Sequence, residues 1–156
     1  MAKGLFYWYF PTKQALFAEL VRTMRLRLRR AQAAAMEPTA PTLARIGQGT
    51  EASVRFMAEN AGYFALLDVE RADRDMADVL TEGPGIYLDD LARLVVEGQR
   101  AGELRDDNAE LLAVGVLGAV SSFSNSFRNG RLDVSVEELA TFVRSWVTNA
   151  LAAPPG

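Results

Sequence analysis

The chain has 156 residues, and its 49% hydrophobic content is enough apolar side chain for a packed domain rather than a disordered chain. It contains no Cys and no His, which excludes a disulfide, a thiolate metal site and the commonest general base. These absences argue against a hydrolase or a transition-metal enzyme. We therefore expect a protein that is not an enzyme and needs no cofactor or metal.

The net charge of −3 is unevenly distributed along the chain. Residues 1–30 hold seven Lys or Arg against one Glu, a net +6, so the remaining residues carry −9. A basic end on an acidic body is typical of an end that faces nucleic acid, and we expect Lys3 and Lys13 to contact phosphate. The alternative is that the arginines of residues 22–30 only form a solvated helix face.

No segment predicts a membrane span, because the longest apolar run, residues 111–120, is shorter than the roughly 18 residues required. The first residues do not resemble a signal peptide, because polar residues follow Phe10 too soon. We expect a cytoplasmic location and no membrane partner.

The N-terminal part predicts two helices. The first predicted helix covers residues 2–9. Five consecutive aromatics, Phe6 to Phe10, lie at its end, and they cannot all face one core because a helix turns about 100° per residue. Pro11 breaks this helix, and Thr12 can cap the next, whose apolar residues recur at three- and four-residue spacing to about Met36. The prolines of residues 38–41 predict a linker, so we divide the chain into domains 1–36 and 37–156.

The rest of the chain also predicts helices, and the fold class is all-α. Helices are expected over 41–60, 63–71 and 86–101, with Gly102 at a C-terminal cap. The acidic stretch 72–85 has no clear pattern and ends in a predicted break at Gly83-Pro84-Gly85. Asp107 heads a predicted capping box for a helix through Phe127, and Ser135 heads another for a last helix through Leu151.

Two segments carry a family resemblance. The sequence KGLFYWYFPTKQALF, residues 3–17, resembles the end of the helix-turn-helix and the start of the fourth helix in the TetR family of transcriptional regulators. EGQRAGELR, residues 97–105, is similar to the junction of the seventh and eighth helices of that family. The resemblance implies a TetR-like helical regulatory domain with the remnant of a helix-turn-helix. Because two helices precede this segment in the family, we expect a chain truncated within its DNA-reading domain.

The resemblance also implies a DNA site. Lys3 is the expected base reader, with guanine its natural partner, and Lys13 is expected to contact phosphate at a helix N-terminus. Trp8 is expected either on the sugar-phosphate edge or inside the domain. The expected DNA-binding residues are Lys3, Gly4, Tyr7, Trp8, Tyr9 and Lys13. Operator DNA would be the partner of the full-length protein, and we expect this chain to bind it weakly or not at all.

A small hydrophobic effector is expected among the middle helices, as in the family. The candidate wall residues, each of which also suits ordinary core packing, are Phe56, Met57, Phe64, Met76, Tyr87, Leu91 and Phe123. Hydroxyls and an amide interrupt the apolar helix near its end, at Ser121, Ser122, Ser124, Asn125 and Ser126. If buried, they need a ligand, a second subunit or their own backbone as partner. Acidic composition with an apolar lining slightly favours a neutral or cationic ligand.

The last two helices carry more apolar residues than one core-facing stripe needs. We expect them to form a four-helix homodimer interface of Val116, Ala119, Val120, Phe142, Val143, Trp146 and Val147. The alternative is that these residues fill only the core of one chain. The function that follows is a TetR-family repressor that binds a small effector and dimerises. The rival is a dimeric small-molecule-sensing module that does not read DNA.

Overall fold

The computed structural model describes residues 9–156, and for residues 81–84 its backbone only. Within them the chain forms six α-helices and one short 3-10 helix: α2 (Lys13–Ala35), α3 (Thr42–Glu59), α4 (Ala61–Glu70), η1 (Arg74–Met76), α5 (Ala77–Arg100), α6 (Ala109–Arg128) and α7 (Val136–Leu151). These residues contain no β-strand, only one isolated bridge between Leu104 and Ala152. The all-α prediction is confirmed.

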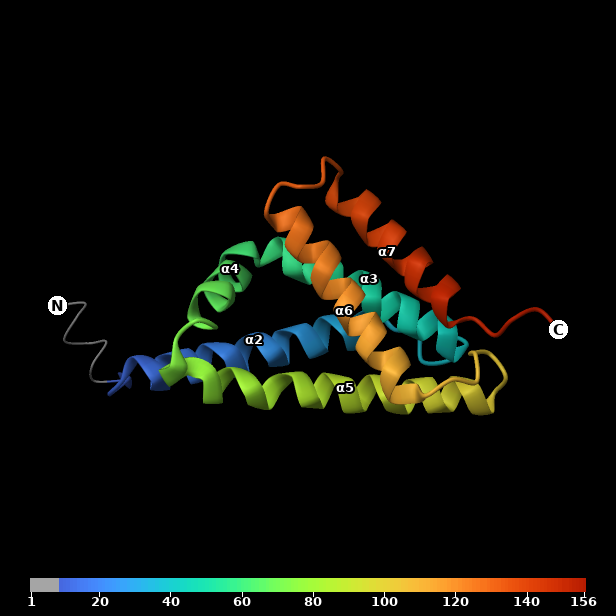
Figure 1. The fold of residues 1–156 in the computed structure, drawn as a ribbon, viewed down its shortest axis with the longest axis horizontal. Coiled ribbons are helices and arrows are strands. Elements are labelled where there is room, and N and C mark those ends of the chain that lie inside the picture. Colours follow the sequence, from blue (N-terminus) through green and yellow to red (C-terminus); the bar gives the residue numbers. More distant parts are fainter. Residues whose placement is uncertain (1–8) are drawn as a thin grey trace.

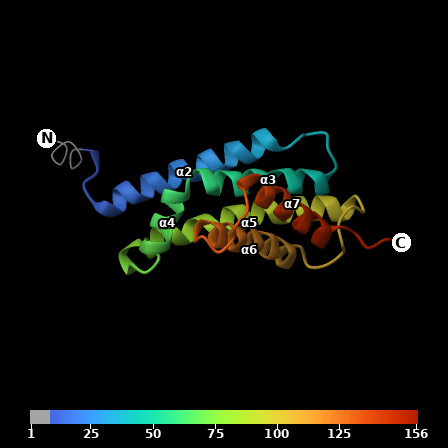
Figure 2. The same cartoon turned by 90° about the horizontal axis from the view of Figure 1, so that it is seen from above.

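The helices form a frame around a central region (Figure 1). α2 and α5 run side by side in the same direction, tied by contacts between Arg25 and Tyr87 and between Arg29 and Asp90. The short α4 leads from the end of α3 back towards the start of α5. α6 packs on α5, α3 and α7, and the view from above shows α3 between α2 and the α6–α7 pair (Figure 2).

α2 forms where the sequence predicts it. Thr12 adopts an extended conformation, and its Oγ1 accepts a hydrogen bond from the Ala15 amide at 3.0 Å, which satisfies one of the unpaired N–H groups of the first turn. The helix buries Phe17, Val21, Met24 and Leu28 at three- and four-residue spacing. It therefore presents one continuous apolar stripe to α3, α4 and α5.

The predicted break at Gly83-Pro84-Gly85 is wrong, because α5 continues as one helix through these residues. Pro84 lacks the N–H that would bond one turn back, which costs a helix interior roughly 3 kcal/mol. Packing on either side offsets this cost. Val79 and Leu80 pack against the cluster of Phe17, Val21 and Met76, while Tyr87 packs against that of Met24, Leu28 and Phe56. Tertiary contacts here outweigh local propensity.

The caps of the last helices follow the sequence closely, with one shift. Asn108, not Asp107, caps α6, since its side chain accepts from the Leu111 amide at 3.0 Å. The predicted capping box of Ser135 is confirmed, with reciprocal bonds to Glu138 of 3.1 and 2.8 Å. Gly102 takes a φ of +73° just after α5, the left-handed cap that glycine adopts without strain.

The main core lies where α3, α6 and α7 meet. Its buried members are Ile46, Val54, Val95, Leu104, Val116, Val120, Leu139, Ala140, Val143, Val147 and Leu151. The two clusters that hold α2, built on Met76 and on Phe56, are smaller and separate from it. The half of the molecule formed by α2, α4 and the start of α5 is therefore less densely filled than the α3–α7 half.

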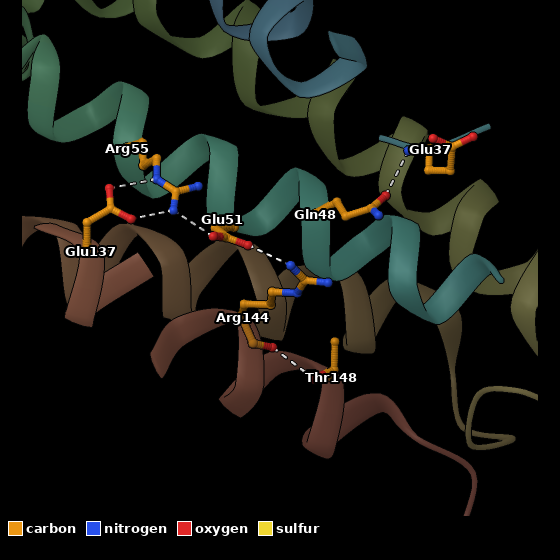
Figure 3. Close-up of polar contacts among 7 residues, drawn as sticks. All are labelled: Glu37, Gln48, Glu51, Arg55, Glu137, Arg144 and Thr148. Carbon is orange, nitrogen blue, oxygen red and sulfur yellow. Dashed lines mark hydrogen bonds and ion pairs between the residues drawn. The ribbon is translucent and has the colours of Figure 1, made fainter. Parts of the chain in front are cut away.

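α3 and α7 run antiparallel along a seam of ion pairs (Figure 3). Arg55 donates to both carboxylate oxygens of Glu137, at 3.1 and 2.6 Å, and also pairs with Glu51 at 2.7 Å. Arg144 pairs with the same Glu51 at 2.8 Å. Further along, a Cβ added to Gly47 would lie 2.8 Å from Cγ2 of Thr148, so the two helices are too close here for a larger residue at position 47 without a shift. The seam fixes the register of the two helices.

Replacement of Glu137 with Gln should reduce the acid sensitivity of the fold. The hydrogen bonds from Arg55 lower the pKa of Glu137 below its ordinary value. A lowered folded-state pKa means that the pair stabilises the fold above about pH 4.3, and that this contribution is lost as the pH falls through the folded pKa. We expect Glu137→Gln to have a lower Tm at pH 7 and a smaller fall in Tm between pH 7 and pH 3. Thermal unfolding followed by circular dichroism measures both.

The matched control is Glu110→Gln, which removes an exposed carboxylate from the first turn of α6 and leaves the seam intact. An acid-induced fall in Tm that is as large in Glu137→Gln as in the unchanged chain would contradict the prediction.

Candidate functional site

A cavity of about 550 Å³ lies inside the frame, and five helices supply its wall. α2 contributes Val21, Met24, Arg25, Leu28 and Gln32, and α3 contributes Ile46, Gly49, Thr50, Ser53, Phe56 and Met57. The rest of the wall is Met36, Tyr63, Phe64, Leu67, Arg71, Leu80, Tyr87, Leu91, Leu94, Val116, Leu117, Val120 and Ser121. Its size and its apolar wall with a few polar groups match sites that bind drug-sized molecules.

Aromatic rings line one side of the cavity. The ring of Phe64 meets that of Phe56 edge-on at a centroid distance of 6.4 Å and that of Tyr63 at 5.0 Å. These edge-to-face contacts are the favoured geometry for aromatic pairs. The ring cluster holds α4 against α3 and gives the cavity a firm apolar surface.

A chain of hydrogen bonds satisfies the polar groups near the C-terminal end of α2. Nε2 of Gln32 donates to Oγ of Ser53 at 2.9 Å, and that hydroxyl donates to the Gly49 carbonyl oxygen at 2.7 Å. Ser53 is a buried residue, so this pairing removes the cost of an unsatisfied hydroxyl.

A second polar group lies between α2, α4 and α5. The Tyr87 hydroxyl donates to the Arg25 carbonyl oxygen at 3.3 Å, and Nη2 of Arg25 donates to the Val79 carbonyl oxygen at 3.4 Å. Burial raises the pKa of both Tyr63 and Tyr87, and the nearby positive charge of Arg25 opposes this rise. Both phenols are therefore neutral hydrogen-bond donors at neutral pH. No cluster of three acidic side chains that could hold a metal ion occurs within residues 9–156.

No protein-family model matches the sequence, and no curated protein matches it. Solved structures do match. A protein of unknown function from Rhodococcus sp. RHA1 has 26% identity and a TM-score of 0.77, with 92% of this chain and 76% of that chain covered. A putative TetR-family transcriptional regulator from Rhodococcus sp. has 16% identity and a TM-score of 0.79, with 96% and 80% covered. The chain has the TetR fold. A regulatory protein of the tetR family from Rhodococcus RHA1 agrees, with 16% identity, a TM-score of 0.75, and 97% and 80% covered.

In this TetR fold, five of the seven expected effector residues line the cavity: Phe56, Met57, Phe64, Tyr87 and Leu91. The other two lie elsewhere. Met76 is fully buried against Phe17 and Val21, and Phe123 packs on Phe142 and Trp146 at 5.7 and 6.0 Å. The expectation for Met76 and Phe123 is therefore corrected. Spacing along one helix shows that a residue is apolar and inward, but not whether it faces the cavity or the core.

The contribution of α2 to the wall was not anticipated. Its apolar stripe is indistinguishable in sequence from any core-facing stripe, and Arg25 belongs to a run of arginines that reads as a solvated face. The only available signal is that Arg25 follows Met24 on the buried side of the helix, whereas Arg22 and Arg30 are exposed.

The hydroxyl cluster of α6 is divided between different surroundings. Ser121, Ser122 and Asn125 are exposed, and of these three Ser121 lines the main cavity. Ser124 is buried, and its Oγ has no hydrogen-bond partner among the described residues. It faces a second cavity of about 180 Å³ beside Phe127. The backbone carbonyl one turn back, an expected partner, does not accept from this hydroxyl.

The seven expected interface residues also fall into two groups. Val116, Val120, Val143 and Val147 are buried within the chain, as the core-packing alternative requires, and Ala119 is partly buried. Phe142 and Trp146 are exposed, at 55% and 46%. Together with exposed Leu111, Val114, Gly115 and Gly118 they form what we call the α6–α7 face.

α6 is more apolar than its coverage requires. Among the described residues it is the helix long and apolar enough to resemble a membrane span, by length and composition only, yet just 22% of that window is buried. Added Cβ atoms at Gly115 and Gly118 would meet nothing within 4 Å. The α6–α7 face is therefore an open apolar surface with room for close approach of another helix.

The expected DNA-binding residues lie at the start of the chain. Lys3, Gly4, Tyr7 and Trp8 fall outside the described residues, and Tyr9 is 68% exposed. Nζ of Lys13 lies 3.2 and 3.3 Å from the two carboxylate oxygens of Glu70, a buried residue at the end of α4. The charge of Lys13 thus already serves an internal ion pair that ties the start of α2 to α4.

Loss of Lys13 should destabilise the fold more than loss of an exposed arginine. In Lys13→Met the Glu70 carboxylate, whose side chain is only 10% exposed, loses its cation. We expect a loss of about 1–2 kcal/mol in the free energy of unfolding, measured by urea denaturation. Lys13→Met/Glu70→Gln should recover part of it, because a neutral amide is cheaper to bury than an unpaired charge.

Arg22→Met is the control for this prediction, because it breaks an exposed pair with Glu19 in the same helix. Its effect should stay below about 0.5 kcal/mol. Equal losses in Lys13→Met and Arg22→Met would show that the Glu70 pair contributes nothing special.

Proposed function

We propose that this chain is the effector-binding and dimerising part of a TetR-family transcriptional repressor. The observation that carries the proposal is the cavity of about 550 Å³ lined by five helices of a TetR fold. A cavity of this size beside a well-packed α3–α7 core is unusual, because protein interiors pack densely and have few voids larger than a water molecule. A small hydrophobic molecule is the natural occupant of its apolar wall.

The effector proposal is tested with a neutral apolar dye, N-phenyl-1-naphthylamine, whose fluorescence rises when it leaves water. We expect saturable binding at one site per chain. Leu91→Trp places a larger side chain in the wall and should weaken binding at least about ten-fold, because overpacking costs about 1–3 kcal/mol.

Leu26→Trp is the matched control, because Leu26 is 50% exposed on α2 and lies outside the wall. Its dye affinity should equal that of the unchanged chain. Dye binding that is absent, or that is unaffected by Leu91→Trp, would remove the cavity as the effector site.

We further propose that a second copy of the chain covers the α6–α7 face. Phe123 packs edge-on against both Phe142 and Trp146, which joins the exposed rings of α7 to α6 in one surface. Leu111, Val114, Gly115 and Gly118 repeat at three- and four-residue spacing beside them. Two such helix pairs, related by a two-fold axis, form a four-helix interface in which the glycines permit close packing.

Phe142→Glu should convert the dimer into a monomer. A carboxylate at the centre of a dry apolar interface has no cation to pair with, and loss of a central aromatic commonly costs more than about 2 kcal/mol of association. Sedimentation equilibrium measures the mass. Leu26→Glu introduces the same charge at an exposed apolar residue of α2, which α3 separates from the α6–α7 pair (Figure 2), and should remain dimeric. A monomeric unchanged chain, or a dimeric Phe142→Glu, would contradict this interface.

The proposed regulation links the cavity to DNA through α2. The helix carries cavity residues from Val21 to Gln32, and its first residue, Lys13, follows the segment that resembles a DNA-reading helix. An effector that binds one arrangement of the dimer better than another shifts the population between them and so alters operator binding. In this proposal Lys3, Gly4, Tyr7, Trp8, Tyr9 and Lys13 belong to the DNA-facing end.

A further inference from the structure

We propose that the effector is an amphipathic anion, such as a carboxylate with an apolar body, and that Arg25 binds its charged group inside the cavity. The inference rests on the proposed effector function of this cavity and adds the chemical class of its occupant. It reverses the preference for a neutral or cationic ligand that the acidic composition of the whole chain suggests.

The described charges in the cavity wall are positive. Among the described side chains, the wall contains two that are charged, Arg25 and Arg71, and no Asp or Glu. The overall acidity of the chain therefore lies outside the cavity and is largely screened from it by solvent. A cationic ligand would face the guanidinium group of Arg25, and an anion would be attracted by it.

Among the side chains that the structure describes, Arg25 has no acidic partner, unlike other arginines near it. Within the described residues no carboxylate lies within ion-pair distance of it, and its guanidinium makes one long hydrogen bond, of 3.4 Å, to Val79. In contrast, Arg29 lies 2.9 Å from Asp90, and Arg71, with a side chain 65% exposed, lies 3.6 Å from Asp68. A guanidinium has five N–H donors in a planar fork, so most of the hydrogen-bonding capacity of Arg25 is unused.

Arg25 is only partly exposed, which raises the value of an anionic partner. A charge held away from water without a partner is costly, and a carboxylate relieves that cost through a paired, charge-assisted contact with the fork. Tyr63 and Tyr87 lie in the same part of the wall as neutral phenols. The Tyr63 hydroxyl makes no hydrogen bond within the described residues, so it is available as an additional donor to an anion.

The remainder of the wall suits the apolar body. The polar groups further along α2 are paired in the Gln32–Ser53–Gly49 chain of hydrogen bonds and need no hydrogen bond from a ligand. Gln32 is seven residues from Arg25, about 10 Å along the helix. Between them lies the apolar wall of Leu28, Leu91 and Leu94. The anion therefore lies at the α4 end of the cavity, and the apolar body extends towards Gln32.

The test uses three ligands with one tail and different head groups: decanoate, decan-1-ol and decyltrimethylammonium. Each competes with N-phenyl-1-naphthylamine on the intact chain. We expect decanoate to displace the dye at least ten-fold more effectively than decan-1-ol, and decyltrimethylammonium to be the weakest. Arg25→Gln should weaken the binding of decanoate at least ten-fold and leave the affinity for decan-1-ol within two-fold of that of the unchanged chain. Retained binding of decan-1-ol also shows that the variant is folded.

Arg30→Gln is the matched control, because it removes an exposed arginine of the same helix and should leave all three affinities unchanged. Dye binding with equal displacement by decanoate and decan-1-ol would overturn the head-group assignment while leaving the effector cavity intact. An equal loss of decanoate affinity in Arg25→Gln and Arg30→Gln would overturn the role of Arg25. If neither the dye nor any of the three ligands binds, the proposed function itself fails.

Discussion

The close packing of α3 on α7 is the constraint on which the rest of the structure depends. Gly47 lets the two backbones approach, and the network of Arg55, Glu137, Glu51 and Arg144 fixes their register. Because α6 packs against the same pair, one half of the molecule is a dense core. α2, α4 and the start of α5 then rest on that core through two small clusters, and the cavity is the space left between the dense half and this looser layer.

Local sequence signals predicted most of the helical frame. Thr12, Ser135 and Gly102 act at helix ends as their side chains or backbone freedom require. The errors arose where long-range packing decided the outcome. Gly83-Pro84-Gly85 has every local feature of a break, but α5 is held on both sides by contacts with α2 that are distant in sequence. The shift of the α6 cap from Asp107 to Asn108 is a smaller error. Both residue types cap helices well, so only the geometry of the loop selects one of them.

The cavity and the α6–α7 face were predictable in composition but not in detail. The family resemblance pointed to seven aromatic, methionine and leucine residues of the middle helices, and five of them line the cavity. It gave no indication of Arg25, because an arginine in a basic run is normally solvated. Similarly, periodicity marked α6 and α7 as too apolar for one stripe, yet it did not separate buried Val116 and Val143 from exposed Phe142. That separation depends on where a neighbouring helix lies, which no single helix encodes.

The position of Arg25 on α2 has a mechanical consequence. The C-terminal end of α2 is fastened to α3 by the Gln32–Ser53 bond and by the Glu37 amide on Gln48. The N-terminal end is held by the Lys13–Glu70 ion pair and by Phe17 and Val21, which pack against Met76. If the C-terminal end stays fixed, any tilt of α2 pivots near Ala35. At 1.5 Å per residue, Arg25 lies about 15 Å and Lys13 about 33 Å from that pivot. A sideways movement of this helix at the cavity would therefore be about doubled at its N-terminal end.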